Sequence, residues 1–475
     1  MSLNEKERER TAESAAGSWG ALFGPGARGP VTVLAGGVAL YAINVYLTTS
    51  LLPSAVAEIG GFELYAWAMT AFLIASVISS MLVSRTLARR GPRLAYWIGL
   101  GLFGAGSVVA AVAPTMPVLL GGRALQGLGG GLLAGLAFAV IRIVLPEALW
   151  KRSYGLLSVM WGIGNVVGPL LGGLFAQLGA WRGAFVLLAV ASAGIAVLAG
   201  RAIPGGGATE SGAGRIPLLS LTLLTLATTA VSVASIVGPS PTMVVLIAVA
   251  VLLVAGFVVA DRTGSAQVLP RATFRRGSVL LWIYLSVAVL AITSTVETFL
   301  PLFGQRIGGM SPLAAGLLGA ALSWGWSIGS IVNSGVTRPA ATRLARLTGP
   351  VLVAVGLAGY TALQASPAGP VRIAFWFVAL VIAGTGIGMA LVHWMPAAMS
   401  VSPDPAESQQ AAAGLNTVQL IANAFGSALA GLLVGLGGPT MIGSAQALGY
   451  GYAVVGALAL VIAVAALKLR TARRE

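Results

Sequence analysis

Two charged side chains, Arg123 and Glu297, stand inside long apolar runs of this sequence. A charge in such a run is costly to bury, so it needs a reason. A buried carboxylate can take up and release a proton, and a guanidinium near it can pair with it. We interpret Glu297 as the protonatable switch and Arg123 as its partner, because all other acids fall in tails, loops or edges of the apolar runs. The alternative is that Glu297 snorkels to the aqueous boundary and Arg123 packs structurally.

Long apolar segments must position these charges. Of the 475 residues, 57% are hydrophobic and 9% are charged, whereas a soluble domain carries about 25% charged residues. Such a chain cannot cover itself with polar surface, so its main solvent must be lipid. A helical span needs about 20 apolar residues, and the sequence predicts fourteen spans, at 31–52, 65–84, 94–113, 117–141, 154–178, 183–202, 216–237, 241–260, 278–302, 312–336, 347–364, 371–395, 411–436 and 449–468.

The basic residues predict the orientation of the spans. Of the 28 Lys and Arg, only Arg123 falls in the interior of a span, and only Arg182, Arg306 and Arg372 fall in the loops and span ends of one side. All others fall on the opposite side, and loops rich in Lys and Arg stay in the cytoplasm. We therefore expect a multi-pass protein of the inner (plasma) membrane with both termini in the cytoplasm.

Composition also excludes several classes of function. The chain has no cysteine and a single histidine, so thiolate and multi-histidine metal sites are excluded. Its lysines fit no P-loop spacing, and no nucleophile–base constellation is present, so we expect neither an enzyme nor a cofactor. The net charge of +15 lies in short loops between spans, which does not indicate a nucleic-acid surface. The expected partners are a small-molecule substrate, protons and membrane lipids, with no nucleic acid, and the chain is expected to be a monomer.

Two polar linkers, 204–214 and 261–277, divide the spans into groups of six, two and six. The first is rich in glycine, which is typical of a flexible connection. The predicted organisation is a cytoplasmic tail at 1–30, a six-helix bundle at 31–202, linkers with two inserted helices at 203–277, a second six-helix bundle at 278–468 and a tail at 469–475.

A glycine pattern in the fifth span is the strongest motif. Glycines at such spacing flatten one helix face, so that another helix can approach closely, and the proline bends the helix. The string resembles the antiporter motif of drug exporters of the major facilitator superfamily; its members here are Gly155, Gly164, Gly168, Pro169, Gly172 and Gly173.

Further segments extend this resemblance over the whole chain. The strings 122–127 (GRALQG), 181–185 (WRGAF), 269–275 (LPRATFR) and 414–419 (GLNTVQ) are similar to segments of the fourteen-span drug:proton antiporters. The resemblance implies an all-α membrane protein of the major facilitator fold, with two six-helix bundles, two inserted helices and a central cavity.

Two positions depart from that family. The gating loop between spans 2 and 3 keeps basic residues and one glycine (Arg85, Arg89, Gly91 and Arg93) but has Ala88 where the family has an acid. In span 1, Asn44 stands where many members have an acid. A neutral amide does not gain or lose a proton at physiological pH. Both departures put the family's usual coupling scheme in question.

Polar stripes predict the walls of the cavity. Span 1 offers Tyr41, Asn44 and Thr48 on one face, and span 9 offers Ser286 and Thr293 on the face of Glu297. Gln126 in span 4 and Trp324 in span 10 complete the candidate set; an aromatic ring could bind an apolar or cationic compound, or simply pack.

Three hypotheses about function follow. The first is proton-coupled efflux of amphiphilic or hydrophobic compounds by alternating access, as the resemblance implies. The second is a facilitator or a lipid or metabolite transporter with altered or absent coupling, suggested by Asn44 and Ala88. The third is a membrane sensor or scaffold without transport.

Overall fold

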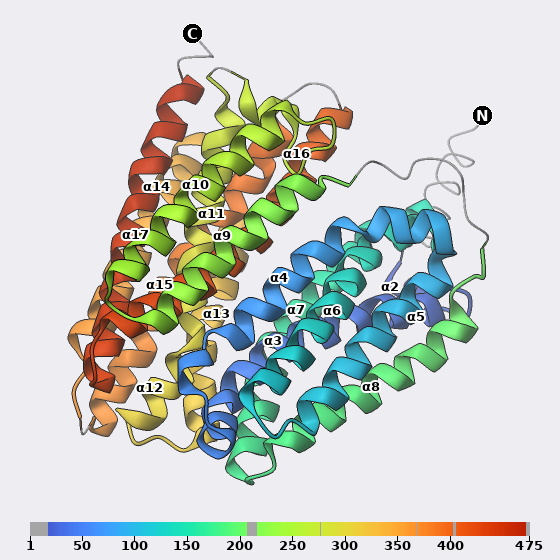
Figure 1. The fold of residues 1–475 in the computed structure, drawn as a ribbon. Helices are drawn as coiled ribbons and strands as arrows, with labels where there is room; N and C mark the ends of the chain where they lie inside the picture. Colours follow the sequence, from blue (N-terminus) through green and yellow to red (C-terminus); the bar gives the residue numbers. More distant parts are fainter. Residues whose placement is uncertain (1–17, 207–215, 276, 367, 402–404, 472–475) are drawn as a thin grey trace, which may run out of the picture. The chain divides into compact units, whose positions relative to one another are not determined.

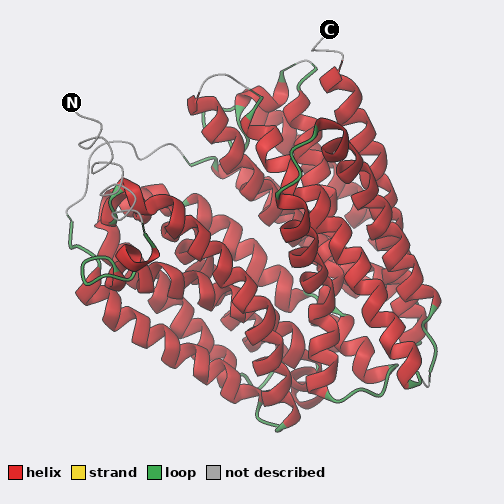
Figure 2. Ribbon diagram, turned by 180° about the vertical axis from the view of Figure 1, so that it is seen from behind, coloured by secondary structure: helices red, strands yellow, loops and turns green. Residues whose placement is uncertain are grey.

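The chain is helical throughout the part that the structure, a computed structural model, describes: residues 18–206, 216–275, 277–366, 368–401 and 405–471. Figure 2 shows helices joined by short loops, with no strand among these residues. The elements, labelled in Figure 1, are α2 (Trp19–Leu22), α3 (Arg28–Ile59), η1 (Phe62–Leu64), α4 (Trp67–Met81), α5 (Val83–Ala111), α6 (Met116–Val144), α7 (Glu147–Gln177), α8 (Trp181–Ala202), α9 (Leu218–Val237), α10 (Pro241–Thr263), η2 (Arg271–Phe274), α11 (Val279–Ser294), η3 (Thr295–Thr298), α12 (Leu300–Arg306), α13 (Pro312–Ser334), α14 (Pro339–Ala362), α15 (Pro370–Met399), α16 (Pro405–Leu436) and α17 (Met441–Thr471).

Local sequence sets where several helices begin. Pro241 and Pro312 are the first residues of α10 and α13, where the missing N–H of proline costs nothing. Each follows a serine whose hydroxyl caps the helix: Ser240 Oγ accepts from the N–H of Met243 at 3.2 Å, and Ser311 caps α13 in the same way. Serine–proline pairs therefore fix these two starts.

The predicted span count is confirmed. Fourteen helices or helix pairs of the described residues are long and apolar enough to cross a membrane, and each overlaps one predicted span. The largest extension beyond a predicted span is at the start of α5, which begins at Val83 although the predicted span begins at 94. Parts of the two predicted tails and of the first linker (1–17, 207–215 and 472–475) lie outside the described residues.

By their contacts, the described residues form two compact units. One contains 18–47, 75–168 and 182–206; the other contains 48–74, 169–181 and the described residues from 216 onward. The inserted helices α9 and α10 belong to the second unit, where α9 packs against both α10 and α16. The bundle boundaries predicted from the linkers stay a prediction.

The ninth span is interrupted, which the sequence-based prediction of one continuous helix at 278–302 missed. α11 ends at Ser294, a 3-10 turn covers Thr295–Thr298, and α12 begins at Leu300. The physical reason is Pro301, which has no N–H to donate to the carbonyl of Glu297 four residues earlier. The break is therefore centred on the candidate carboxylate, and interruptions of this kind often mark functional hinges.

The segment 84–93, expected to be a loop, is largely helical. α5 begins at Val83 and contains one non-helical residue, Gly91, with φ of 70°. A Cβ atom at Gly91 would also collide with the backbone oxygen of Gly206. Only glycine fits both the conformation and this close approach, so Gly91 marks the kink at which the membrane-spanning part of α5 begins.

Candidate functional site

Arg123 lies at the centre of a buried polar cluster in the first unit. Its Nη1 donates to Asn44 Oδ1 at 2.9 Å and to Gln126 Oε1 at 2.7 Å. Gln126 Nε2 in turn donates to Ser107 Oγ at 2.8 Å. Arg123, Asn44 and Gln126 are fully buried. Amide oxygens from two helices thus solvate a guanidinium in an apolar setting.

The sequence positions these groups on three neighbouring helices. Arg123 and Gln126 are three residues apart on α6, so both point from one face. α5 approaches that face closely, because a Cβ at Gly122 would lie 2.8 Å from the nitrogen of Ala110. Asn44 of α3 accepts a hydrogen bond from Arg123, and its predicted part in the substrate cavity stays a prediction. The neutral amide therefore has a structural use here.

Tyr41 lies one helical turn from Asn44 and is also buried. Its ring meets Trp161 edge-on at 5.5 Å between centroids. Its Cδ2 atom lies where a Cβ at Gly130 would be only 2.8 Å away. An aromatic contact therefore lies beside the Arg123 cluster, within the same unit.

Glu297 lies in the second unit, on the 3-10 turn of the ninth span. Its Oε1 accepts a hydrogen bond of 2.5 Å from Ser323 Oγ of α13. The side chain is half-buried, while Ser323 is 2% exposed. An acid in an apolar span that accepts from a buried hydroxyl is a candidate proton carrier. Because Arg123 belongs to the other unit, its pairing with Glu297 stays a prediction.

The other predicted cavity residues differ in their contacts and in the unit to which they belong. Ser286 and Thr293 are buried, and their hydroxyls donate to backbone oxygens of their own helix, Trp282 at 2.8 Å and Leu290 at 2.7 Å. Trp324 meets Phe377 edge-on at 5.8 Å between centroids. Thr48 is buried, but it belongs to the second unit, whereas Tyr41 and Asn44 belong to the first. Their part in substrate binding stays a prediction.

The glycines of the antiporter motif differ in their surroundings. Gly164 and Gly168 press α7 against α3: an added Cβ would lie 2.5 Å from Ala42 Cβ and 2.7 Å from Tyr46 Cβ. In the second unit, a Cβ at Gly173 would lie 2.7 Å from Leu313 Cα of α13. Gly155, by contrast, has no neighbour within 4 Å of an added Cβ. Close packing therefore explains the glycines at 164, 168 and 173, and it does not explain Gly155.

Pro169 and Gly172 complete the motif. The backbone oxygen of Pro169 lies 3.1 Å from the position of a Cβ at Gly316 of α13, and Gly172 is buried. The segment that follows Gly168 thus packs on α13 through backbone atoms.

Arg93 fixes the chain that follows α8. Its Nε donates to the backbone oxygen of Ile203 at 2.8 Å. Arg85 is partly exposed and Arg89 is exposed, both in the helical turns before Gly91. Of the predicted gating residues, Gly91 and Arg93 therefore hold the end of α8 beside the start of the membrane-spanning part of α5.

The sequence-based reasoning missed several buried polar positions, among them Ser107, Asp261 and Arg346. Ser107 joins the Arg123 cluster, and nothing in its apolar surroundings predicts this. Asp261, assigned to a linker, is fully buried and accepts from Ser220 Oγ at 3.1 Å and from the N–H of Val268 at 2.7 Å. Arg346, assigned to a loop, is 6% exposed in α14.

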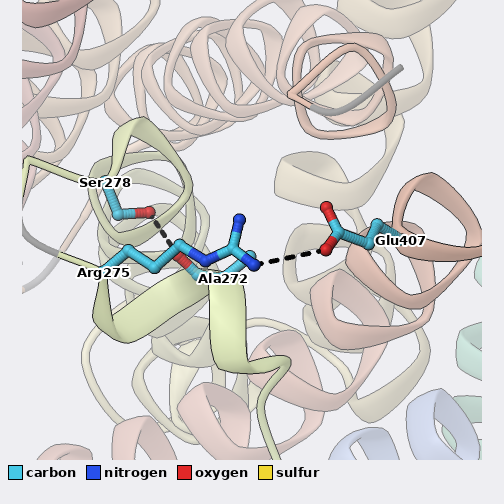
Figure 3. Close-up of polar contacts among 4 residues, drawn as sticks. All are labelled: Ala272, Arg275, Ser278 and Glu407. Atoms are coloured by element: carbon cyan, nitrogen blue, oxygen red, sulfur yellow. Dashed lines mark hydrogen bonds and ion pairs between the residues drawn. The ribbon is translucent and has the colours of Figure 1, made fainter. Parts of the chain in front are cut away.

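The second linker is folded against the second unit. Ser278 Oγ donates to the backbone oxygen of Ala272 at 2.7 Å, and Arg275 pairs with Glu407 of α16 at 3.4 Å, as Figure 3 shows. The pair is solvent-exposed, so it contributes little stability by itself. Together with the hydrogen bonds to Asp261, these contacts hold both ends of the linker.

The inserted helix α9 and the helix α16 are both attached to α4. Trp67 Nε1 of α4 donates to the backbone oxygen of Ser232 in α9 at 3.1 Å. Thr70 Oγ1 donates to Ser427 Oγ of α16 at 3.2 Å. Ser427 thus joins α16 to α4 through a buried hydroxyl pair.

Comparison with known proteins supports the fold. The family model "Major Facilitator Superfamily" matches residues 34–419. The chain is 44% identical over 454 residues to a "Probable multidrug-efflux transporter" of Mycobacterium tuberculosis, covering 94% of this chain and 96% of that protein. It is 22% identical over 360 residues to the "Multidrug transporter protein MdtP" of Bacillus subtilis, covering 74% of this chain and 65% of that protein.

Solved structures with little sequence identity share the architecture. A bacterial homolog of the human lysosomal transporter Spinster, described as inward-facing and unoccupied, has a TM-score of 0.65 at 16% identity, covering 93% of this chain and 96% of that chain. A POT family transporter in complex with a thioalcohol-conjugated peptide has a TM-score of 0.64 at 14% identity, covering 92% and 94%. At these identities the likeness concerns the fold alone.

Proposed function

Because the chain belongs to the major facilitator superfamily, we propose that it is a secondary active transporter that exports amphiphilic or hydrophobic small molecules. The observation that supports this most directly is the 44% identity to a probable multidrug-efflux transporter over 94% of the chain. Both termini are proposed to lie in the cytoplasm, with the chain in the inner membrane, because of the distribution of its basic residues.

Proton coupling through Glu297 is the finer part of the proposal. It is supported by the break of the ninth span at this residue and by the hydrogen bond from Ser323 Oγ at 2.5 Å. When protonated, the carboxyl keeps an acceptor oxygen for Ser323 and gains a donor. Protonation would therefore change what Glu297 can bind, and the adjoining 3-10 turn could respond by a change in the angle between α11 and α12.

Transport into proteoliposomes of the purified protein, with and without an imposed pH gradient, tests the proposal. Glu297→Gln preserves the shape and the oxygen that accepts from Ser323 but cannot titrate. It should bind substrate and lose uphill export driven by the gradient, while Glu297→Asp keeps part of it. Glu407→Gln is the matched control, since Glu407 is a surface carboxylate with an exposed ion pair. Wild-type accumulation by Glu297→Gln would refute the coupling role.

A facilitator without proton coupling is the second candidate, and the surroundings of Asn44 favour it. At this position, where the family resemblance implies an acid, the amide oxygen of Asn44 accepts from the guanidinium of Arg123 at 2.9 Å. The same assay separates the candidates: flux that ignores the pH gradient supports a facilitator. Absence of any flux would support the sensor or scaffold hypothesis.

A further inference from the structure

An open groove lies on the surface of the first unit, between α5 and α8. Its volume is about 580 Å³, and its lining includes Trp97, Gly101 and Gly104 of α5 and Ser192, Ala193 and Val197 of α8. α5 and α8 lie along each other in Figure 1. The groove is open where α5 has glycines: no heavy atom lies within 4 Å of a Cβ added at Gly101.

The polar groups in the walls are already satisfied by the protein. Ser192 Oγ donates to the backbone oxygen of Leu100 at 2.8 Å, and Trp97 Nε1 donates to that of Ala196 at 2.9 Å. An apolar occupant therefore leaves no donor of these side chains unpaired. An acyl chain is the apolar ligand that a membrane supplies to such a surface.

Both walls end in an arginine on the same side. Along α5, Arg93 precedes Trp97 by four residues, and along α8, Arg201 follows Val197 by four residues. Positions four apart share a helix face and are separated by about 6 Å along the axis. On each of the two helices, an arginine therefore lies one turn beyond the last groove residue and on the same helix face. Arg201 is exposed, and Arg93 is partly exposed and held in place by its bond to Ile203.

The aromatic ring between groove and arginines fits the same arrangement. Trp97 is 45% exposed, and a Cβ at Gly200 would lie 3.0 Å from its ring. Tryptophan favours the boundary between acyl chains and headgroups. The order along the groove is therefore an apolar slot, then a tryptophan, then two cations, which complements an apolar chain attached to an anionic headgroup.

We propose that this groove binds one molecule of an anionic glycerophospholipid, with an acyl chain between α5 and α8 and its phosphate at Arg93 and Arg201. The two guanidiniums supply planar, charge-assisted hydrogen bonds to phosphate oxygens. The side of the arginines is the side predicted to be cytoplasmic, so the lipid would come from the inner leaflet. This site is separate from the Arg123 and Glu297 clusters and does not depend on transport.

Mass spectrometry of the intact, detergent-purified protein tests the proposal. Increasing amounts of phosphatidylglycerol, or of phosphatidylcholine with the same acyl chains, are added, and the lipid-bound fraction is measured. Phosphatidylglycerol should bind at lower concentration, and glycerol phosphate should not displace it. Arg93→Gln with Arg201→Gln should weaken phosphatidylglycerol binding by about fivefold for each arginine removed. Arg343→Gln, an exposed arginine of α14, is the matched control and should bind as wild type.

A second pair of variants tests the apolar slot. Gly101→Leu fills the groove, whereas Gly194→Leu places the same side chain on the exposed face of α8, outside the groove; both positions have open space within 4 Å, so both variants should fold. Gly101→Leu should lose most of the phosphatidylglycerol binding, and Gly194→Leu should retain it. Equal binding of both lipids, undiminished binding by Gly101→Leu, or equal losses in Gly101→Leu and Gly194→Leu would each overturn the proposal.

Discussion

Substitution of Gly168 by alanine tests whether the antiporter motif works by close packing of α7 on α3. An added Cβ would lie 2.7 Å from Tyr46 Cβ and 2.9 Å from the backbone oxygen of Ile43. Carbon atoms pack best at about 3.5–4.0 Å, so α7 would have to retreat by roughly 1 Å. Because the neighbours are backbone atoms and a Cβ, no side chain can rotate away.

Gly155 of the same helix is a matched control, because an added Cβ there meets open space. Both variants gain the same helix propensity from alanine, so this gain cancels in the comparison. Gly168→Ala should therefore be less stable than Gly155→Ala by about 1–3 kcal/mol, the usual cost of overpacking.

Thermal unfolding in detergent measures the stabilities, and drug efflux from cells measures the function. Gly168→Leu should insert into the membrane and lose export, whereas Gly155→Leu should keep it. If the variants at the two positions have equal melting temperatures and equal efflux, the packing argument is wrong.

Three further predictions concern the buried polar groups and the topology. Pro301→Ala restores an N–H that can bond the carbonyl of Glu297, so the ninth span should become continuous and gradient-driven export should fall, as measured in proteoliposomes; unchanged export would contradict a role for the break. Asn44→Ala removes an acceptor from Arg123 and should lower the free energy of unfolding by about 1.5–3 kcal/mol, while Asn44→Asp should restore it in thermal melts. A cysteine in place of Ser211 should react with an impermeant reagent only after cells are opened, since the chain has no native cysteine; labelling of intact cells would refute the predicted orientation.

Much of the fold could be predicted because the lipid solvent acts on each span separately. Every span must satisfy its own backbone hydrogen bonds and present about 20 apolar residues, so each is visible as a run in the sequence. The ends of the helices were harder to predict than their number. α14 begins at Pro339 and α16 at Pro405, before the predicted span starts at 347 and 411, because a helix continues beyond its apolar run wherever its backbone bonds can.

The candidate site was accessible to sequence reasoning only in part. Glu297 and Arg123 stand out because charge is rare in the spans, and that rarity is a property of composition. The partners Ser107 and Ser323 depend on which helices meet and at what rotation, and a serine in an apolar run is common. Asp261 was assigned to a linker, because the sequence does not reveal that Val268 and Leu269 fold back to donate to it.

The sequence by itself determined the membrane as solvent, the fourteen spans and the two rare charges, because each is decided by residue types within one segment. Only the tertiary structure decided that Asn44 serves Arg123, that Gly168 is packed while Gly155 is open, and that α5 and α8 leave a groove ending in two arginines. These features depend on distances between residues far apart in the chain. Those distances follow from the packing of whole helices, which no single segment encodes.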